Sequence, residues 1–356
     1  MENTPSYAAE AERVGQRIAA LRRSDTLVFP IFTDLHTRSL DAPVTQAFFE
    51  AMDALSQTVC ADAVIALGDN LAMLGREEHA PNETIRAIIR GLFEKVSSFW
   101  PCPLLPVNGN HDGIGTDFFK ADFWHDISSG FDRGTAQRAG NSAYYTVDFT
   151  RARVRLIVLS LPSDSDLTLE NPAPRWAFGD EQLKWLSDTA LRTDYQVLLV
   201  CHVPLYYAYT DKKDWKIGVW TGDRAAESYV SALCGWIDDR DDAEAILSAF
   251  HAHTAFHSDR LGTSLPASPE SAGLIACLSG HMHDDSLFNA GETIGAETNR
   301  LPCAQVQSGS TSVSLNRPLR DGAALPISMD VAVLTPSERR LTMVRYGAGT
   351  DRTIRW

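Results

Sequence analysis

The sequence lacks any long hydrophobic segment. A membrane-spanning helix needs about 20 predominantly apolar residues, so the chain is expected to have no membrane span. Residues 1–25 also lack the apolar stretch of a secretory signal, and Val14, Ile18 and Leu21 fall at helical spacing instead. These features predict a cytoplasmic protein that begins with an amphipathic helix.

Cysteine is sparse, and the six cysteines form no C-x-x-C pair. This pattern argues against a zinc ribbon and against a disulfide framework. We expect the cysteines to be small buried side chains.

Positive charge is also in short supply. The chain has 32 basic and 46 acidic residues, which gives a formal net charge of −14. This balance argues against long nucleic acid or an anionic membrane as a partner. It remains compatible with a small phosphate ester whose charge is met by metal ions. Hydrophobic residues make up 44% of the chain, as in ordinary globular proteins.

Several catalytic motifs are missing from the sequence. It contains no G-x-S-x-G elbow, no P-loop and no G-x-G-x-x-G loop, so neither a serine nucleophile nor a nucleotide-binding loop is predicted. It also lacks H-E-x-x-H, which counts against a single-metal hydrolase of amides or carboxyl esters.

Hydrophobic patterning predicts alternating strands and helices over the first two thirds of the chain. Strands are predicted at residues 26–33, 63–67, 104–107, 143–149, 154–160, 196–200 and 273–279. Residues 300–356 are predicted to be C-terminal β-strands, and residues 203–272 an irregular insertion or lid. We therefore expect a single α/β domain over residues 1–356, with two sheets, one of them finished by a C-terminal meander.

Five of the predicted strands end in polar side chains that can bind metal. The ends read TDLH (Asp34, His36), GDN (Asp69, Asn70), NGNHD (Asn110, His111, Asp112), CHVP (His202) and SGHMH (His281, His283). In open α/β sheets, ligands bind at the carboxyl ends of the strands. Each pair alone is a weak signal, but five strand ends carrying Asp, Asn and His together predict a metal site.

The number of these side chains predicts more than one ion. Four imidazoles, two carboxylates and one amide oxygen are too many ligands for a single ion that must also bind substrate. Two ions that share one carboxylate would use them all. A mixed nitrogen and oxygen set suits transition metals such as Mn, Fe, Zn or Ni.

The order TDLH, GDN, GNHD, CH, GHMH resembles the calcineurin-like metallophosphoesterase superfamily, which includes purple acid phosphatases, Ser/Thr phosphatases and several phosphodiesterases. The resemblance covers residues from about 26 to 283. It implies a four-layer α/β/β/α sandwich of two mixed sheets, with two metal ions at the carboxyl ends of the strands. It also implies hydrolysis of a phosphate ester through attack by a hydroxide held between the ions.

The resemblance further implies a role for each residue that matches the family's motifs. The first ion would be held by Asp34, His36 and His283, and the second by Asn110, His202 and His281. Asp69 would bridge the two ions, and His111 would face the leaving group as a catalytic residue.

One position departs from the family's pattern. Many members that cleave monoesters have an Asp three residues after the GD aspartate, where it orients the catalytic histidine. Here that residue is Ala72, and Asp112 is the candidate substitute and second catalytic residue. This departure slightly favours a phosphodiester over a monoester substrate. The alternative is a catalytically silent binding or scaffold protein on the same fold, although such proteins usually lose ligands.

The histidines at 251, 253 and 257 could suggest a further metal cluster. We interpret them as exposed side chains near a loop, because the five strand ends already provide a complete ligand set.

Overall fold

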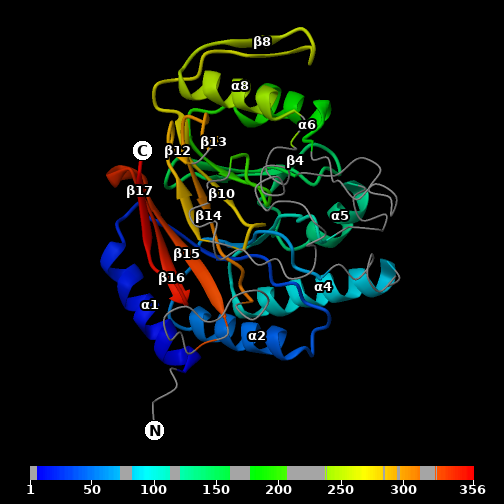
Figure 1. Cartoon of the computed structure of the whole chain (residues 1–356), viewed down its shortest axis with the longest axis vertical. Helices are drawn as coiled ribbons and strands as arrows, with labels where there is room; N and C mark the ends of the chain where they lie inside the picture. Colours follow the sequence, from blue (N-terminus) through cyan, green and yellow to red (C-terminus); the bar gives the residue numbers. More distant parts are fainter. Residues whose placement is uncertain are drawn as a thin grey trace.

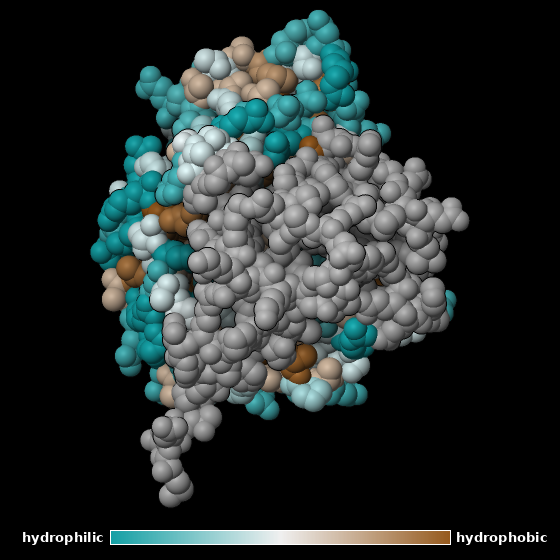
Figure 2. All heavy atoms as spheres, viewed as in Figure 1, coloured by the Kyte–Doolittle hydropathy of each residue, from teal (hydrophilic) through white to brown (hydrophobic). Residues whose placement is uncertain are grey.

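The computed structural model describes residues 6–72, 82–112, 121–160, 177–206, 237, 239–283, 285–294, 297–312, 325 and 327–356. Within these residues no helix is long and apolar enough to cross a membrane. On the face drawn in Figure 2, the described surface is mostly hydrophilic, and its hydrophobic residues form small separate groups.

One sheet has six strands in the order β17-β16-β15-β1-β2-β3. Its strands are β1 (Leu27–Phe32), β2 (Val64–Ala66), β3 (Leu104–Pro106), β15 (Ser328–Thr335), β16 (Arg340–Gly347) and β17 (Arg352–Arg355). Strands β1, β2 and β3 are parallel, whereas β15 pairs antiparallel with β1. All six residues of β1 are buried, which matches a central strand covered on both faces.

The other sheet has seven strands in the order β11-β14-β10-β7-β6-β5-β4. They are β4 (Gln137–Arg138), β5 (Tyr145–Phe149), β6 (Val154–Val158), β7 (Gln196–Val200), β10 (Gly273–Ser279), β11 (Ser286–Phe288) and β14 (Ala304–Gln307). Strands β6, β7, β10 and β14 are parallel. The edge strand β11 runs antiparallel to β14, and at the other side β5 runs antiparallel to both β6 and the edge strand β4.

Three hydrophobic cores define four layers. The central core joins the two sheets and includes Phe29, Ile65, Leu156, Leu198 and Leu278. A second core lies between the six-stranded sheet and its helices, and a third lies between the seven-stranded sheet and its helices. The predicted four-layer α/β/β/α sandwich of two mixed sheets is therefore confirmed.

Helices cover the outer face of each sheet (Figure 1). The six-stranded sheet is covered by α1 (Tyr7–Leu21), α2 (Pro43–Ser56), α4 (Asn82–Phe99) and α5 (Ala121–Ser128). The seven-stranded sheet is covered by α6 (Asp180–Trp185), the π-helical turn η2 (Leu186–Ala190) and α8 (Arg240–His251). Short elements complete the fold: β8 (Phe256–Ser258), β9 (Thr263–Leu265), β12 (Thr293–Ile294), β13 (Glu297–Thr298) and the 3-10 turn η5 (Pro336–Glu338).

The C-terminal strands are divided between the two sheets. Strand β14 joins the seven-stranded sheet, whereas the meander β15-β16-β17 extends the six-stranded sheet beyond β1. The reason is the burial of β1. Its backbone groups on the side away from β2 need hydrogen-bond partners, and β15 provides them.

Part of the segment 203–272 is regular. Residues 207–236 and 238 lie outside the described residues, but α8 and the hairpin β8-β9 occupy much of 239–272. Helix α8 buries Ile246 and Phe250 against the seven-stranded sheet. A lid role for this segment stays a prediction.

The central core gives a stability prediction. Leu198→Ala removes a side chain that is fully buried between the two sheets, so it is expected to lower the free energy of unfolding by about 2–5 kcal/mol. Leu21→Ala, at the half-buried end of α1, is the matched control and should lower it less. Urea denaturation followed by circular dichroism measures both variants. Equal losses would contradict the assignment of the core.

Candidate metal centre

The predicted ligands lie together where the carboxyl ends of parallel strands from both sheets meet. Asp34 and His36 follow β1, Asp69 follows β2, Asn110 follows β3, His202 follows β7, and His281 and His283 follow β10. Within the six-stranded sheet, the Asp34 amide donates to the Gly68 carbonyl at 2.9 Å. Between the sheets, the His281 amide donates to Asp34 Oδ2 at 3.0 Å.

Left-handed backbone is concentrated at this site. The non-glycine residues with positive φ include Asp34, His36, Asp69, His281 and His283, with φ between 49° and 75°. Such residues are uncommon and cost on the order of 1–3 kcal/mol each, so they persist only where neighbours hold them. Five of them at one cluster of polar side chains indicate a functional site.

Two glycines allow the ligand loops to approach one another. A Cβ at Gly109 would clash with the backbone and the carboxylate of Asp69. A Cβ at Gly68, whose φ is +94°, would clash with the His202 ring. Gly68 precedes Asp69 and Gly109 precedes Asn110 in the sequence. These glycines are a sequence signal of the site that an analysis of His, Asp and Asn residues alone misses.

The ligand atoms form two groups that share one carboxylate. Asp34, His36, Asp69 and His283 place one ligand atom each within 4.8 Å of one another. Asp69, His202 and His281 form the second group by the same measure. Asn110 joins the second group, because its Oδ1 lies 2.8 Å from His281 Nδ1 and 3.2 Å from His202 Nε2.

The hydrogen bonds of His202 direct a lone pair into the second group. Its Nδ1 lies 2.7 Å from the Leu67 carbonyl, which can only accept, so Nδ1 is assigned the proton. The other nitrogen, Nε2, then faces Asp69 Oδ2 at 3.2 Å. A cation bound between the two atoms would displace the proton from Nε2 and accept a lone pair from each.

Each buried aspartate has one oxygen satisfied by the protein and one directed into the cluster. Asp34 Oδ2 accepts from Thr33 Oγ1 at 2.7 Å, and Asp69 Oδ1 accepts from the His111 amide at 2.7 Å. Asp34 Oδ1 and Asp69 Oδ2 are buried without a hydrogen-bond partner in the part of the chain that the structure describes. This arrangement fits a metal site whose ligands are oriented by outer hydrogen bonds. The nitrogen and oxygen donors fit a transition metal.

Comparison with known proteins agrees with this geometry. The family model for calcineurin-like phosphoesterases matches residues 28–285, which is well over half of the chain. The chain belongs to the calcineurin-like phosphoesterase family. The predicted resemblance is thereby confirmed, and membership supports assignment as a hydrolase of phosphate esters.

Solved structures share the fold of this calcineurin-like phosphoesterase at low identity. A dimetal phosphatase from Danio rerio is 12% identical with a TM-score of 0.60, over 93% of this chain and 99% of that one. A structure of PhoD is 10% identical with a TM-score of 0.51, over 89% of this chain and 65% of that one. No curated protein matches the sequence.

The two aspartates at the centre of this phosphoesterase have lowered pKa values. Burial by itself would raise the pKa of Asp34, but the charges of His283 and His202 lower it to about 2. Burial would also raise the pKa of Asp69, yet the neighbouring histidines hold it well below its usual value. Both groups are therefore carboxylates at neutral pH, which is the form that binds metal.

The histidines divide into two kinds. Burial lowers the pKa of His36 and of His281 to about 3, so both rings are neutral at neutral pH. For His202, burial acts in the same direction, but the charge of Asp69 outweighs it and raises the pKa to about 9. The pKa of His283 is also raised, because the charge of Asp34 opposes the effect of burial. A metal ion bound to His202 and His283 would displace those protons.

His111 lies beside the two groups and is absent from both. Its amide is held by Asp69, and its ring lies 4.5 Å from the His36 ring, measured between centroids. The His111 side chain is 27% exposed, whereas that of His202 is 1% exposed. His111 is thus open to a substrate, and burial lowers its pKa.

Asp112 is engaged with backbone and amide groups. Its buried carboxylate accepts from the Leu71 amide at 3.0 Å, from Asn70 Nδ2 at 3.0 Å and from the Gly109 amide at 2.9 Å. Within the described residues the structure records no bond from Asp112 to the His111 ring. These contacts tie the loop after β2 to the loop after β3, and a catalytic part for Asp112 stays a prediction.

The other histidine-rich segment does not form a metal group. His251 Nδ1 accepts from the Leu274 amide at 3.2 Å, and His257 Nε2 lies 2.9 Å from Asp259 in an exposed pair. Neither belongs to a metal-capable group among the described residues.

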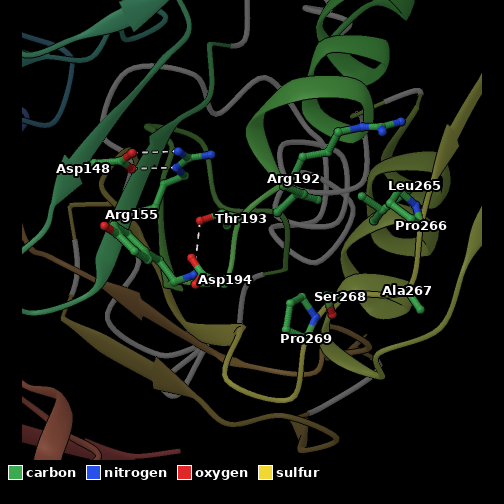
Figure 3. Close-up of a pocket in the computed structure, with 12 residues that line it drawn as sticks. Asp148, Arg155, Arg192, Thr193, Asp194, Leu265, Pro266, Ala267, Ser268 and Pro269 are labelled. Carbon is green, nitrogen blue, oxygen red and sulfur yellow. Dashed lines mark hydrogen bonds and ion pairs between the residues drawn. The ribbon is translucent and has the colours of Figure 1, made fainter.

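A pocket of about 540 Å³ lies at the end of the seven-stranded sheet where β6 and β7 begin, whereas the metal-capable residues follow the ends of β7 and β10 (Figure 3). Its main buried charges neutralise each other, because Arg155 forms two bonds to Asp148, at 2.6 and 2.7 Å. This pocket is therefore separate from the metal centre and has no comparable set of ligands.

The shared carboxylate gives a direct test of the centre. Asp69→Ala is expected to reduce bound manganese from two ions per chain to at most one, because Asp69 belongs to both groups. Asp259→Ala, at an exposed carboxylate, should leave two ions bound. Metal analysis after gel filtration measures both. Retention of two ions in Asp69→Ala would exclude the shared-carboxylate geometry.

Proposed function

We propose that this calcineurin-like phosphoesterase is a dinuclear enzyme that hydrolyses a small phosphate ester, with a phosphodiester favoured over a monoester. The observation that carries the proposal is the pair of ligand groups sharing Asp69. Asp34, His36 and His283 hold the first ion in this proposal, and Asn110, His202 and His281 hold the second. Two bound ions supply an activated water and an electrophilic clamp for the phosphoryl oxygens.

The protein's own groups prepare this chemistry through their protonation states. The low pKa values of Asp34, Asp69, His36 and His281 keep lone pairs available at neutral pH. The Leu67 carbonyl holds the His202 ring in the tautomer that directs Nε2 inward. Little reorganisation of the protein is then needed when the ions bind.

His111 is the proposed catalytic residue, and its ring N–H donates a hydrogen bond that stabilises the charge developing on the leaving oxygen. The hydrogen bond from the His111 backbone amide to Asp69 Oδ1 couples the position of His111 to the shared carboxylate. The preference for a diester rests on the surroundings of this ring. Ala72 provides no carboxylate, and the oxygens of Asp112 are occupied by Leu71, Asn70 and Gly109.

A comparison of two chromogenic esters tests the activity and the preference. With manganese present, bis-(4-nitrophenyl) phosphate is expected to be hydrolysed with a higher kcat/KM than 4-nitrophenyl phosphate. His111→Ala should lower kcat by about 10²–10³-fold, because the charge that develops on the leaving oxygen loses a hydrogen-bond donor. His257→Ala, at a 69% exposed ring, is the matched control.

Each outcome of that assay is informative. Faster hydrolysis of the monoester would contradict the proposed preference. It would indicate that a carboxylate orients the His111 ring despite Ala72. Two bound ions with no hydrolysis of either ester would favour the alternative, a catalytically silent binding or scaffold protein, over the proposed enzyme.

Metal removal should also change stability. EDTA is expected to lower Tm, because Asp34 and Asp69 would keep buried lone pairs directed at one another without a cation. An ion present at 100 times its Kd stabilises the fold by about 2.7 kcal/mol through mass action. Differential scanning fluorimetry with EDTA, and then with added manganese, measures the shift. A Tm that responds to neither would contradict the metal centre.

A further inference from the structure

A buried ion cluster lies next to the loop that carries two of the proposed ligands. Arg345 on β16 and Asp330 on β15 have side chains that are 1% and 0% exposed, respectively. Arg345 Nη2 bonds Asp285 Oδ1 and lies 3.4 Å from Asp330 Oδ1. Arg352 on β17 also bonds Asp330 and lies 3.4 Å from Asp285. Two arginines and two aspartates thus balance in charge.

The stability of the fold does not by itself explain why these four charged side chains are buried together. Removing charges from water costs several kcal/mol per ion, and well-packed hydrophobic residues of similar size are often as stabilising as a buried ion pair. What the cluster does supply is geometry. It attaches the six-stranded sheet to Asp285, which is two residues beyond His283.

The loop from Gly280 to Asp285 is held at both ends. At its start, Gln307 Nε2 donates to the Gly280 carbonyl at 2.7 Å. At its end, Asp285 Oδ1 accepts from the Gly309 amide at 2.9 Å and from Arg345. Arg352 links the two ends, because it bonds the Gln307 carbonyl and lies 3.4 Å from Asp285 Oδ1.

The backbone between these anchors is strained. His281 has φ 75° and His283 has φ 58°, and neither is a glycine. Such conformations persist when the surrounding structure leaves the chain no alternative. The fixed ends meet this requirement, since they restrain the loop from relaxing to ordinary backbone angles.

We propose that Asp285 and Arg345 are positioning residues that hold His281 and His283 in ligand geometry. The proposal rests on the proposed function, since it takes those histidines to be metal ligands. Neither residue belongs to the two ligand groups. Their effect on the centre passes through the backbone of the loop.

Manganese affinity is the decisive measurement, by titration of the metal-free full chain with Mn²⁺ and detection of free ion by electron paramagnetic resonance. Asp285→Asn removes the charge that Arg345 pairs with and keeps the size of the side chain. It is expected to weaken manganese binding by about 10–100-fold, as loss of an outer contact does at other metal sites.

The matched control is Asp148→Asn, which breaks the Asp148–Arg155 ion pair at the opposite edge of the sheet (Figure 3). It should lower Tm by a comparable amount and leave manganese affinity unchanged. If Asp285→Asn binds manganese as tightly as Asp148→Asn does, the positioning role is excluded.

A milder variant keeps the test open if Asp285→Asn does not fold. Ser328 Oγ accepts from Arg345 Nη1 at 2.7 Å, so Ser328→Ala loosens Arg345 without removing a charge. It is expected to weaken manganese binding several-fold, and unchanged affinity would overturn the proposal. Failure of the proposed function is distinguishable, because the wild-type chain would then bind fewer than two ions or hydrolyse neither ester.

Discussion

The burial of the Asp69 carboxylate among imidazole rings is the constraint on which the rest of this structure depends. Asp69 is 1% exposed, its Oδ1 is held by the His111 amide, and its Oδ2 faces His202 Nε2. An isolated buried carboxylate is costly unless a positive charge or hydrogen-bond donors compensate it. His36 and His281 are neutral at physiological pH, so their rings add no positive charge that would compensate the carboxylate. A bound cation compensates both kinds of group at once.

The two-sheet architecture follows from the same requirement. The proposed ligands that follow β1, β2 and β3 come from the six-stranded sheet, and those that follow β7 and β10 come from the seven-stranded sheet. Only face-to-face packing through the central core brings the carboxyl ends of both sheets together. The bond from the His281 amide to Asp34 Oδ2 joins the two halves at the site itself.

Charge is used differently in the two buried polar regions of the molecule. At the centre, lone pairs are left facing one another, and this arrangement favours metal binding. In the cluster of Arg345, Arg352, Asp285 and Asp330, opposite charges already balance, so this region orders backbone without needing an ion. The two regions meet at the loop of His281 and His283.

The sequence by itself determined the buried strands, the polar residues at their ends and the resemblance to the family. These are local patterns: β1 is a continuous apolar run, and Asp34 and His36 follow it directly. The four-layer sandwich could also be predicted, because the resemblance to the family that these motifs carry implied it.

Only the tertiary structure decided which distant segments meet. Local pattern could not show that β15 pairs with β1, that Asp112 bonds Leu71, Asn70 and Gly109, or that Arg345 reaches Asp285. The Arg345–Asp285 contact joins residues 60 positions apart. The physical reason is that hydrogen bonds and ion pairs act between neighbours in space, and such neighbours are set by sheet order and core packing rather than by spacing along the chain.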